Sequence, residues 1–298
     1  MLSIIIPALN EEQRLPLLLE SIKRQNFSGG YEVIVADAGS KDRTVEIARS
    51  YGCKVVPGGL PAKGRNEGAK VARGDLFLFV DGDSVLPDNF LRGNIKEFRE
   101  NKLDVASVSL YPDSMNPFGI FLCDLFYNWP ARATETFLPH ATNTILVKKT
   151  LHRQMGGFDE TIRLAEDHAY ARDGAELGKF RMLRSAPLLV TTKRFARDGW
   201  AKTYCKCLLC ELYTIYIGPV RSDIFRYRFG HWDEKKKGPG KVVGTLLIPF
   251  KIVWTAIEVA FVVLATVIVS ALSIIGLVGK FVRSRLQEER RLRESREK

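Results

Sequence analysis

The N-terminal part of the chain alternates between short runs of β-branched, apolar residues and longer stretches in which apolar residues recur at the spacing of one helix face. This alternation predicts an α/β fold built on a mostly parallel, doubly wound sheet, with ligands bound at the carboxyl ends of the strands. The predicted strands are Ser3 to Pro7, Glu32 to Ala36, Lys54 to Val56 and Leu76 to Val80, and the predicted helices are Leu15 to Arg24, Thr44 to Tyr51 and Lys63 to Ala72.

Beyond Asp83 the pattern is less regular. Val105 to Tyr111 and Asn143 to Val147 are expected to form further strands. Between them lies an aromatic stretch, Pro117 to Trp129 (PFGIFLCDLFYNW). Such a stretch is either ordinary core or an interfacial helix that contacts lipid or a lipid-like acceptor.

The most apolar part of the chain lies near its C-terminal end. Val259 to Gly279 carries no charged residue and, at about 1.5 Å per residue, is long enough to cross a hydrocarbon core of about 30 Å. We therefore expect a C-terminal transmembrane helix. Val242 to Ile257, which is apolar but interrupted by Pro249 and Lys251, is expected to be an interfacial lead-in; a two-helix hairpin is the alternative.

These patterns divide the chain into four segments. We expect a catalytic α/β domain over residues 1–200, a juxtamembrane helical and basic segment over 201–241, the lead-in with the transmembrane helix over 242–282, and a charged, exposed tail over 283–298.

The net charge of +11 and the pI of about 9.4 predict a polyanionic partner. Many of the basic residues flank the apolar C-terminal part, which favours an anionic membrane surface over nucleic acid, and no nucleic-acid partner is expected.

The five cysteines are odd in number and lack the spacing of a disulfide framework, and Met1 leads directly into a strand. We therefore expect a membrane protein whose catalytic domain lies on the cytosolic face.

The sequence FVDGDS places two carboxylates, Asp81 and Asp83, directly after a buried strand. At a strand's carboxyl end, an Asp-x-Asp pattern directs oxygen ligands toward the crevice where Mg²⁺ or Mn²⁺ could bridge them to a diphosphate. The alternative is a simple turn formed by Asp and Gly. The surrounding sequence has to decide between the two.

Across Leu2 to Arg197 the chain resembles glycosyltransferase family 2 of the GT-A type. The resemblance implies the GT-A fold of nucleotide-diphospho-sugar transferases. The motifs that carry it are SIIIPALNEE (3–12), VIVADAGSKDRT (33–44), KGRNEGAKVARGDLFLFVDGDSVLP (63–87), GGFDE (156–160) and AEDHAYARDGAELGKF (165–180), in the order of the family.

The resemblance also implies which residues hold the donor. Carboxylates suit the N–H donors of a base, whereas helix N-termini and basic side chains suit a diphosphate. For Lys63 the alternative is an ordinary solvated surface lysine. The residues implied are Pro7, Leu9, Glu11 and Asp37 for the base and ribose, Lys63, Arg65 and Asn66 for the diphosphate, and Arg194 and Arg197 as a clamp on donor or acceptor phosphate.

For the chemistry, the resemblance implies Asp83 as the direct metal ligand, with Asp81 nearer the ribose. Glu166 and Asp167 resemble the later acidic pair of the family, in which the second residue is the general base toward an acceptor hydroxyl. The alternative for this pair is a helix N-terminal acidic pair that complements the helix dipole. One departure is visible, because the acidic pair expected before Gly-Ser is here Asp37-Ala38, which leaves base preference open.

We therefore expect an inverting, metal-dependent glycosyltransferase that uses a UDP- or GDP-sugar and a lipid-linked or polyprenyl-phosphate acceptor. The Gln-x-x-Arg-Trp pattern of processive synthases is missing, which favours single transfers. A catalytically inactive, nucleotide-binding membrane scaffold is the alternative. The presence of Asp81, Asp83 and Asp167 argues against that alternative, because a scaffold does not need all three.

Overall fold

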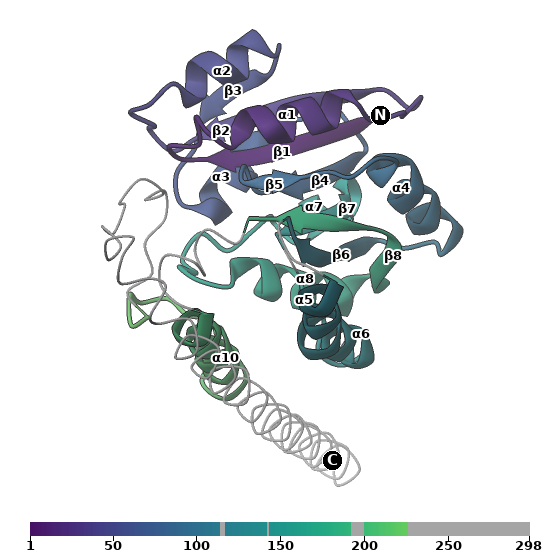
Figure 1. The fold of residues 1–298 in the computed structure, drawn as a ribbon, viewed down its shortest axis with the longest axis vertical. Coiled ribbons are helices and arrows are strands. Elements are labelled where there is room, and N and C mark those ends of the chain that lie inside the picture. Colours follow the sequence, from purple (N-terminus) through teal and green to yellow (C-terminus); the bar gives the residue numbers. More distant parts are fainter. Residues whose placement is uncertain (114–116, 142, 192–199, 226–298) are drawn as a thin grey trace, which may run out of the picture. The chain divides into compact units, whose positions relative to one another are not determined.

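The computed structural model describes residues 1–113, 117–141, 143–191 and 200–225 (Figure 1). The chain divides into two compact units, one comprising Met1–Arg194 and Arg221–Glu234, the other Phe195–Val220 and Lys235–Lys298. The described part of the second unit contains one long helix, α10 (Trp200–Tyr216). The first unit contains the sheet and the other helices.

The strands and helices of the first unit follow the predicted alternation closely. The strands are β1 (Leu2–Ala8), β2 (Tyr31–Asp37), β3 (Lys54–Pro57), β4 (Leu76–Val80), β5 (Ser84–Val85), β6 (Val105–Pro112), β7 (Thr144–Lys148) and β8 (Phe180–Val190). The helices are α1 (Leu15–Lys23), α2 (Thr44–Ser50), α3 (Pro61–Val71), α4 (Phe90–Glu100), α5 (Pro117–Cys123), the π-helix η1 (Asp124–Asn128), α6 (Trp129–Thr134), α7 (Lys149–Gln154) and α8 (Glu166–Leu177).

The strands form one sheet in the order β3-β2-β1-β4-β7-β6-β8-β5. The β3-β2-β1-β4 half is parallel, as predicted. In the other half, β6 and β8 are parallel, whereas β7 is antiparallel to both β4 and β6, and β5 is antiparallel to β8. The sheet is therefore mostly parallel, as predicted, with β7 and β5 reversed. The reason is topological, because the segment between β6 and β7 stays at the edge where β6 ends and β7 therefore runs back.

This topology places the carboxyl ends of β1, β2, β4 and β6 on the same edge of the sheet. The chain leaves β1 toward β2 and β3 on one side and reaches β4 on the other, which makes the β1/β4 boundary the switch point. Crevices at such switch points are where open α/β sheets bind ligands.

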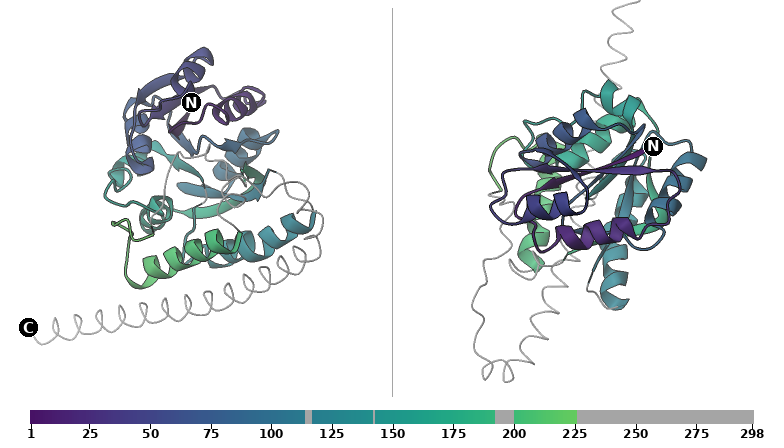
Figure 2. Two further views of the ribbon diagram at one scale, coloured as in Figure 1. Left: turned by 60° about the vertical axis from the view of Figure 1, so that its left-hand side comes forward. Right: turned by 90° about the horizontal axis from the view of Figure 1, so that it is seen from above.

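Helices cover both faces of the sheet (Figure 2). On β1, Ile4 and Ile6 belong to the core that includes residues of α1 and α4, whereas Ile5 belongs to the core that includes residues of α3 and α8. Because successive side chains of a strand point to opposite faces, β1 contributes fully buried residues to both cores. The continuous apolar run of this strand reflects its central position.

Helix α3 packs closely on β1 because it carries glycine at positions 64 and 68. A Cβ at Gly68 would fall well inside van der Waals contact of the buried Ile5 Cγ2, and one at Gly64 would lie 3.2 Å from Pro7 Cβ. This close approach brings the first turns of α3 next to the end of β1.

Gly68→Ala is expected to lower the free energy of unfolding by about 1–2 kcal/mol. Overpacking costs about 1–3 kcal/mol, which exceeds the gain of about 1 kcal/mol from replacing a helical glycine. Urea unfolding of the variant would measure the change, with Lys70→Ala on the exposed face of the same helix as the control. A variant as stable as the unchanged protein would contradict the packing described.

The aromatic stretch forms a helical segment, α5, η1 and α6, beside β6 and β8 (Figure 1). Several of its large apolar side chains are exposed, including Phe121, Leu125 and Trp129. The segment is therefore not ordinary core along its whole length, and its contact with lipid stays a prediction.

Among the helices of the described residues, none has both the length and the apolar character needed to span a membrane. The predicted transmembrane segment Val259 to Gly279, its lead-in and the charged tail lie outside the described residues.

Candidate active site

The loops that follow β1 and β2 are joined to each other by hydrogen bonds. The Asn10 backbone N–H donates to Ser40 Oγ at 2.9 Å, and the Lys41 N–H donates to Asn10 Oδ1 at 2.9 Å. The Glu11 N–H donates to Thr44 Oγ1 at 2.8 Å. Asn10 has a positive φ of 55°, which its short polar side chain tolerates. These bonds fix both loops before a ligand binds.

The predicted base-binding residues lie along this edge. Asp37 ends β2, and its carboxylate accepts the N–H groups of Gly39 and Ser40 at 3.0–3.3 Å. Pro7 and Leu9 are half-buried at the end of β1. The structure thus brings these three predicted residues to the carboxyl ends of two neighbouring parallel strands.

The Asp81-Gly82-Asp83 turn follows β4 at the switch point. The Asp81 N–H donates to the Asn143 carbonyl at 3.2 Å, and the Asp81 carbonyl accepts the Ser84 N–H at 3.2 Å. A Cβ at Gly82 would lie 3.4 Å from Glu11 Cγ, so the buried Glu11 side chain lies against the turn. Asp81 and Asp83 are both half-buried.

Arg65 is the residue that connects the turn to the rest of the site. Its guanidinium is buried, with 3% of the side chain exposed, and it donates to Asp81 Oδ1 at 2.8 Å through Nη2 and to Glu166 Oε1 through Nη1. Burial alone would lower the pKa of Arg65, but the charges of Asp81, Glu166 and Asp167 raise it. The structure gives Arg65 two carboxylate partners, and its expected contact with a diphosphate stays a prediction.

Arg65→Met is expected to lower the free energy of unfolding by roughly 3–5 kcal/mol, because it leaves two carboxylates in a buried site without their cation. Arg65→Lys should recover part of this loss but not all, because an ammonium lacks the planar fork that reaches two carboxylates at once. Chemical unfolding of both variants checks the order. Equal stability of the lysine variant and the unchanged protein would contradict the two-carboxylate role.

Asn66, which was also expected to contact the diphosphate, forms hydrogen bonds through its side-chain amide to the GGFDE loop. Its Nδ2 donates to the Phe158 carbonyl and to Glu160 Oε1, both at 2.9 Å, and its Oδ1 accepts the Phe158 N–H at 2.8 Å. Gly157 has a φ of +88° and lies so close to Asn66 Oδ1 that a Cβ would meet it at 2.6 Å. The diphosphate role of Asn66 stays a prediction.

Phe158 was not predicted as part of the site, although it lies within the GGFDE motif. Its ring lies under the guanidinium of Arg65, at 5.3 Å from Cζ to the ring centroid, and stacks on Tyr170 at 3.8 Å. A cation over an aromatic face is stabilised by the ring quadrupole. The GGFDE motif therefore contributes the aromatic ring that contacts the Arg65 guanidinium.

Glu166 and Asp167 begin α8, as the acidic pair of the sequence predicted. The residue before them, Ala165, has a positive φ of 60°, a conformation that costs a non-glycine residue roughly 1–2 kcal/mol. Strain of this kind is found where the surrounding structure fixes a functional conformation. The left-handed turn starts α8 so that Glu166 faces Arg65.

Asp167 is the titratable residue of the site with the most distinctive environment. Its pKa is raised to about 6, chiefly by burial; the charges of Glu166 and Asp81 also raise it, and those of His168 and Arg65 lower it. About 20% of the side chain remains exposed, so the carboxylate is accessible. Its Oδ1 accepts the His168 N–H at 2.9 Å. A carboxylate in this environment accepts a proton more readily than an ordinary aspartate, as a general base should.

Lys63 lies in the first turn of α3, and its side chain is exposed. Its aliphatic part packs beside Gly59. This position is compatible both with an anion at the helix N-terminus and with an ordinary surface lysine. Arg194 and Arg197 lie outside the described residues.

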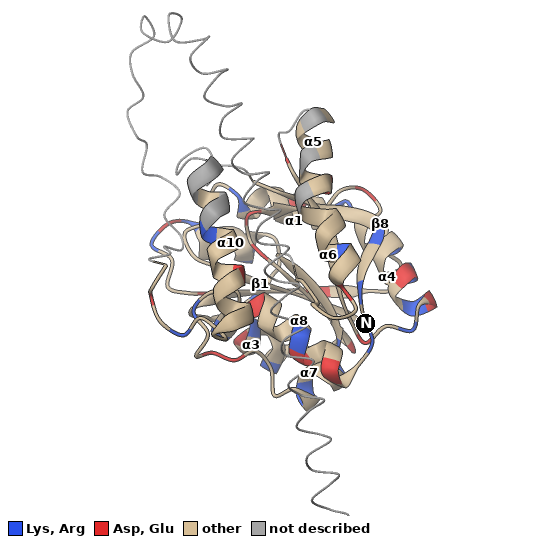
Figure 3. Ribbon diagram, turned by 90° about the horizontal axis from the view of Figure 1, so that it is seen from below, with Lys and Arg blue, Asp and Glu red and all other residues tan. Residues whose placement is uncertain are grey.

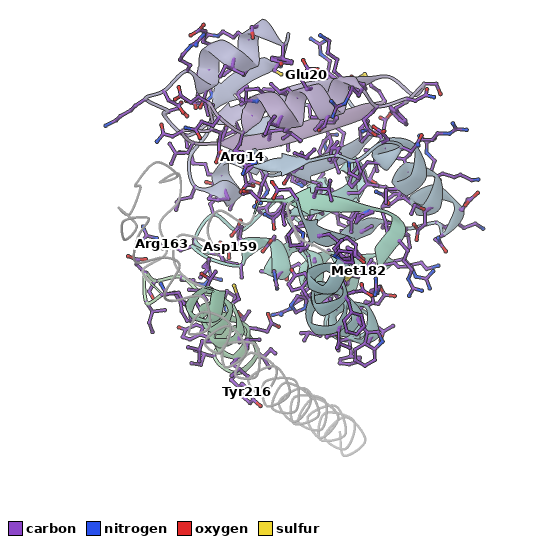
Figure 4. All side chains as sticks on the ribbon, in the orientation of Figure 1. Arg14, Glu20, Asp159, Arg163, Met182 and Tyr216 are labelled. Carbon is purple, nitrogen blue, oxygen red and sulfur yellow. The ribbon has the colours of Figure 1, made fainter. Side chains whose placement is uncertain are left out.

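Arg14, labelled in Figure 4, is a further residue at this edge that the sequence did not single out. It lies just before α1 and donates to Thr191 Oγ1 at 2.6 Å and to Asp113 Oδ2 at 3.3 Å. These two residues follow β8 and β6. Arg14 therefore links the loop after β1 to the residues directly after β8 and β6, a pairing that only the fold reveals.

The residues of the turn fit a hard divalent cation. Asp81 and Asp83 offer carboxylate oxygens, which Mg²⁺ and Mn²⁺ prefer, and Glu11 and Asp167 add negative charge close by. Arg65 balances part of this charge and orients Asp81. The donor set and its electrostatics therefore agree with the predicted metal site.

Comparison with known families and proteins shows the family of the chain and supports its fold. Residues 3–159, just over half of the chain, match the family model described as glycosyl transferase family 2. The uncharacterized glycosyltransferase EpsJ of Bacillus subtilis (strain 168) is 30% identical over 189 residues, which cover 57% of this chain and 54% of EpsJ. The chain thus spans about half the length of this relative.

Another relative is the poly(ribitol-phosphate) beta-N-acetylglucosaminyltransferase TarS of Staphylococcus aureus (strain Mu50), 32% identical over 36% of this chain and 20% of TarS. The solved structure of TarS 1–349 with UDP-GlcNAc has a TM-score of 0.52 and 24% identity, over 64% of this chain and 58% of that chain.

The mannosyltransferase PcManGT from Pyrobaculum calidifontis, solved with GDP-Man and Mn²⁺, has a TM-score of 0.59 and 16% identity, over 89% of this chain and 86% of that chain. At such identities the likeness concerns the fold alone. It supports the α/β fold of the GT-A type that the resemblance implied.

Proposed function

Because the chain belongs to glycosyl transferase family 2, we propose that it transfers a sugar from a nucleotide diphosphate sugar to a lipid-linked or polyprenyl-phosphate acceptor at a membrane. The transfer inverts the anomeric carbon and depends on a divalent cation. One observation carries this proposal: Arg65 joins the Asp81-Gly82-Asp83 turn to the acidic start of α8 at the switch point of the sheet.

The donor would lie along the ends of β1 and β2. Pro7, Leu9, Glu11 and Asp37, at the ends of β1 and β2 and in the loop after β1, would contact a base and ribose. Lys63 lies in the first turn of α3, where a diphosphate would suit the helix N-terminus. The relatives solved with UDP-GlcNAc and with GDP-Man support a UDP- or GDP-sugar as the donor class.

Asp83, with Asp81 beside it, would hold Mg²⁺ or Mn²⁺. When bound, the cation supplies positive charge that stabilises the departing nucleoside diphosphate. The protein's own contribution is orientation, since Arg65 holds Asp81 and the backbone of the turn is bonded to Asn143 and Ser84. The PcManGT complex with Mn²⁺ is consistent with this proposal.

Asp167 would act on the acceptor. An acceptor hydroxyl would lose its proton to the Asp167 carboxylate while its oxygen attacks the anomeric carbon and the bond to the leaving phosphate oxygen breaks. A single in-line displacement of this kind inverts the anomeric carbon. If the acceptor is a lipid phosphate, it is already an anion, and Asp167 would position it instead.

The membrane location of the acceptor rests on the sequence. Val259 to Gly279 is free of charge and basic residues flank the apolar region on both sides. The cysteine pattern favours a catalytic domain on the cytosolic face. Arg194 and Arg197 would contact donor or acceptor phosphate in this arrangement.

Membranes from expressing cells, incubated with labelled nucleotide sugars and Mn²⁺, test the proposal. A labelled product that extracts with lipid, absent when EDTA is added, is the expected result. Binding of a nucleoside diphosphate without transfer or donor hydrolysis across a complete donor panel would instead identify the chain as an inactive scaffold.

A further inference from the structure

The segment α5–η1–α6 carries a row of exposed apolar side chains, which we call the aromatic face and define as Ile120, Phe121, Leu125 and Trp129. Phe121 and Trp129 expose 58% and 60% of their surface, and Leu125 and Ile120 expose 43% and 39%. Positions 121, 125 and 129 are spaced by four residues and so lie along one side of a helix. Contiguous apolar surface of this kind marks an interaction site.

The opposite side of the same segment is fixed to the sheet by polar contacts. The fully buried Asn128 side chain accepts the Leu110 N–H and donates to the Leu110 carbonyl, both at 3.0 Å, and so continues the hydrogen bonding of β6. Asp124 accepts from Arg132 at 2.9 Å and from Tyr111 at 3.0 Å. These polar contacts fix the segment to β6 and leave the aromatic face exposed.

The charge pattern of the segment differs from that of a helix that faces water. Residues 117–131 include one charged residue, Asp124, and it is bonded to Arg132 and Tyr111. By contrast, α4 carries Arg92, Lys96 and Glu100 together with its buried apolar side, as a surface helix does (Figure 3). A partner that binds the aromatic face must therefore contact apolar and aromatic side chains, and it needs no charges complementary to them.

The position of the segment relates it to the proposed reaction. Helix α5 follows the carboxyl end of β6, and this end lies on the same edge of the sheet as the ends of β1 and β4. The Arg14–Asp113 ion pair joins the residue directly after β6 to the loop after β1. The aromatic face thus begins at the edge that carries the acidic turn.

We propose that the aromatic face inserts into the interfacial region of the lipid bilayer and places the acceptor side of the catalytic domain against the membrane. The inference rests on the proposed function, because a lipid-linked acceptor would be presented at that surface. The same chain contains the charge-free stretch Val259 to Gly279, and its net charge of +11 favours anionic lipid. Trp and Phe beside polar anchors are the side chains that settle at membrane interfaces.

Fluorescence of Trp129 in the full chain, reconstituted in vesicles of phosphatidylcholine and phosphatidylglycerol, tests the proposal. The signal of Trp129 is obtained as the difference between the unchanged protein and Trp129→Phe, because the chain has four tryptophans. We expect phosphatidylcholine brominated on its acyl chains to remove most of this difference signal, and aqueous iodide to leave it intact. Quenching is measured without donor or acceptor, so it reports on membrane contact even if no transfer occurs.

Phe121→Ser combined with Leu125→Ser is expected to reduce the quenching and to raise the KM for a lipid acceptor while leaving Mn²⁺-dependent nucleotide binding unchanged, which also shows that the variant is folded. Leu177→Ser, at a similarly exposed leucine at the end of α8, is the matched control and should change neither quantity.

A Trp129 signal that is identical in brominated and ordinary lipid would overturn the proposal. If iodide then quenches it, the face lies in water. If iodide does not, a second copy or the chain's own apolar C-terminal segment covers it. Transfer activity together with unquenched Trp129 would reject this inference and keep the proposed function.

Discussion

The Asp83→Asn variant is expected to lose nearly all transfer activity, with kcat/KM for the donor falling roughly a thousandfold. Removal of one group that stabilises developing charge typically costs a factor of about 10²–10³ or more. Here the amide would also weaken the hold on the cation, since it replaces an anionic oxygen ligand by a neutral one. Initial rates at saturating Mn²⁺ and varied donor concentration measure the loss.

Asp88→Asn provides the matched control for this experiment, because Asp88 lies five residues further along and is exposed. It should retain activity within about twofold, as expected of a surface substitution. If Asp83→Asn kept most of its activity at low Mn²⁺, the turn would not be the metal site. If both variants failed together, the loss would reflect misfolding, which thermal unfolding of each would reveal.

Asp167→Asn is expected to lower kcat/KM for a hydroxyl acceptor by about 10²–10⁴-fold, the usual contribution of a positioned general base. In the unchanged protein, activity should rise with pH through the pKa of Asp167, about 6, because only the carboxylate accepts a proton. The groups that face it are His168, Glu166, Arg65 and Asp81. A variant whose rate is flat over this range supports the assignment.

The same substitution should stabilise the fold at neutral pH. The pKa of Asp167 is raised above its value of 3.8 in the unfolded chain, so the stability associated with the protonated form is complete below pH 4 and is lost as pH rises through about 6. The amide introduced by Asp167→Asn is uncharged in both the folded and the unfolded chain. The variant should therefore show a free energy of unfolding roughly 3 kcal/mol higher than that of the unchanged protein at pH 7, and little difference near pH 4.

Asp173→Asn, six residues further along α8 at an exposed position, is the control for the rate measurement. It should leave the kcat/KM for the acceptor unchanged. A large loss of stability in Asp167→Asn, or a rate unaffected by it with a hydroxyl acceptor, would contradict the general-base assignment. A small rate effect with a lipid phosphate acceptor would show that Asp167 positions an acceptor that is already anionic.

The sequence predicted the parallel half of the sheet well because each element there carries its own local signal. Runs of β-branched or other apolar residues predicted β1 to β4, and the helical periodicity predicted α1 to α3 with ends correct to within about two residues. The antiparallel return of β7 was not predicted. Its direction depends on the path of the segment between β6 and β7, which no local pattern specifies.

At the site, the carboxylates were predicted and their organisation was not. Asp81 and Asp83 follow a recognisable strand, and their Asp-x-Asp pattern together with the family resemblance made them candidates. Arg65 was expected at the diphosphate because a basic side chain near a helix start suits an anion. Its pairing with Glu166 was not predicted, because Glu166 lies 101 residues away and a contact at that separation is decided by tertiary packing.

The most direct test of the account is Mn²⁺ binding followed by electron paramagnetic resonance, with and without UDP or GDP. The account predicts that a nucleoside diphosphate tightens Mn²⁺ binding to the unchanged protein and to Asp88→Asn, and that Asp83→Asn abolishes this effect. Equal nucleotide-dependent Mn²⁺ binding by Asp83→Asn and the unchanged protein would contradict the central claim that this turn holds the cation.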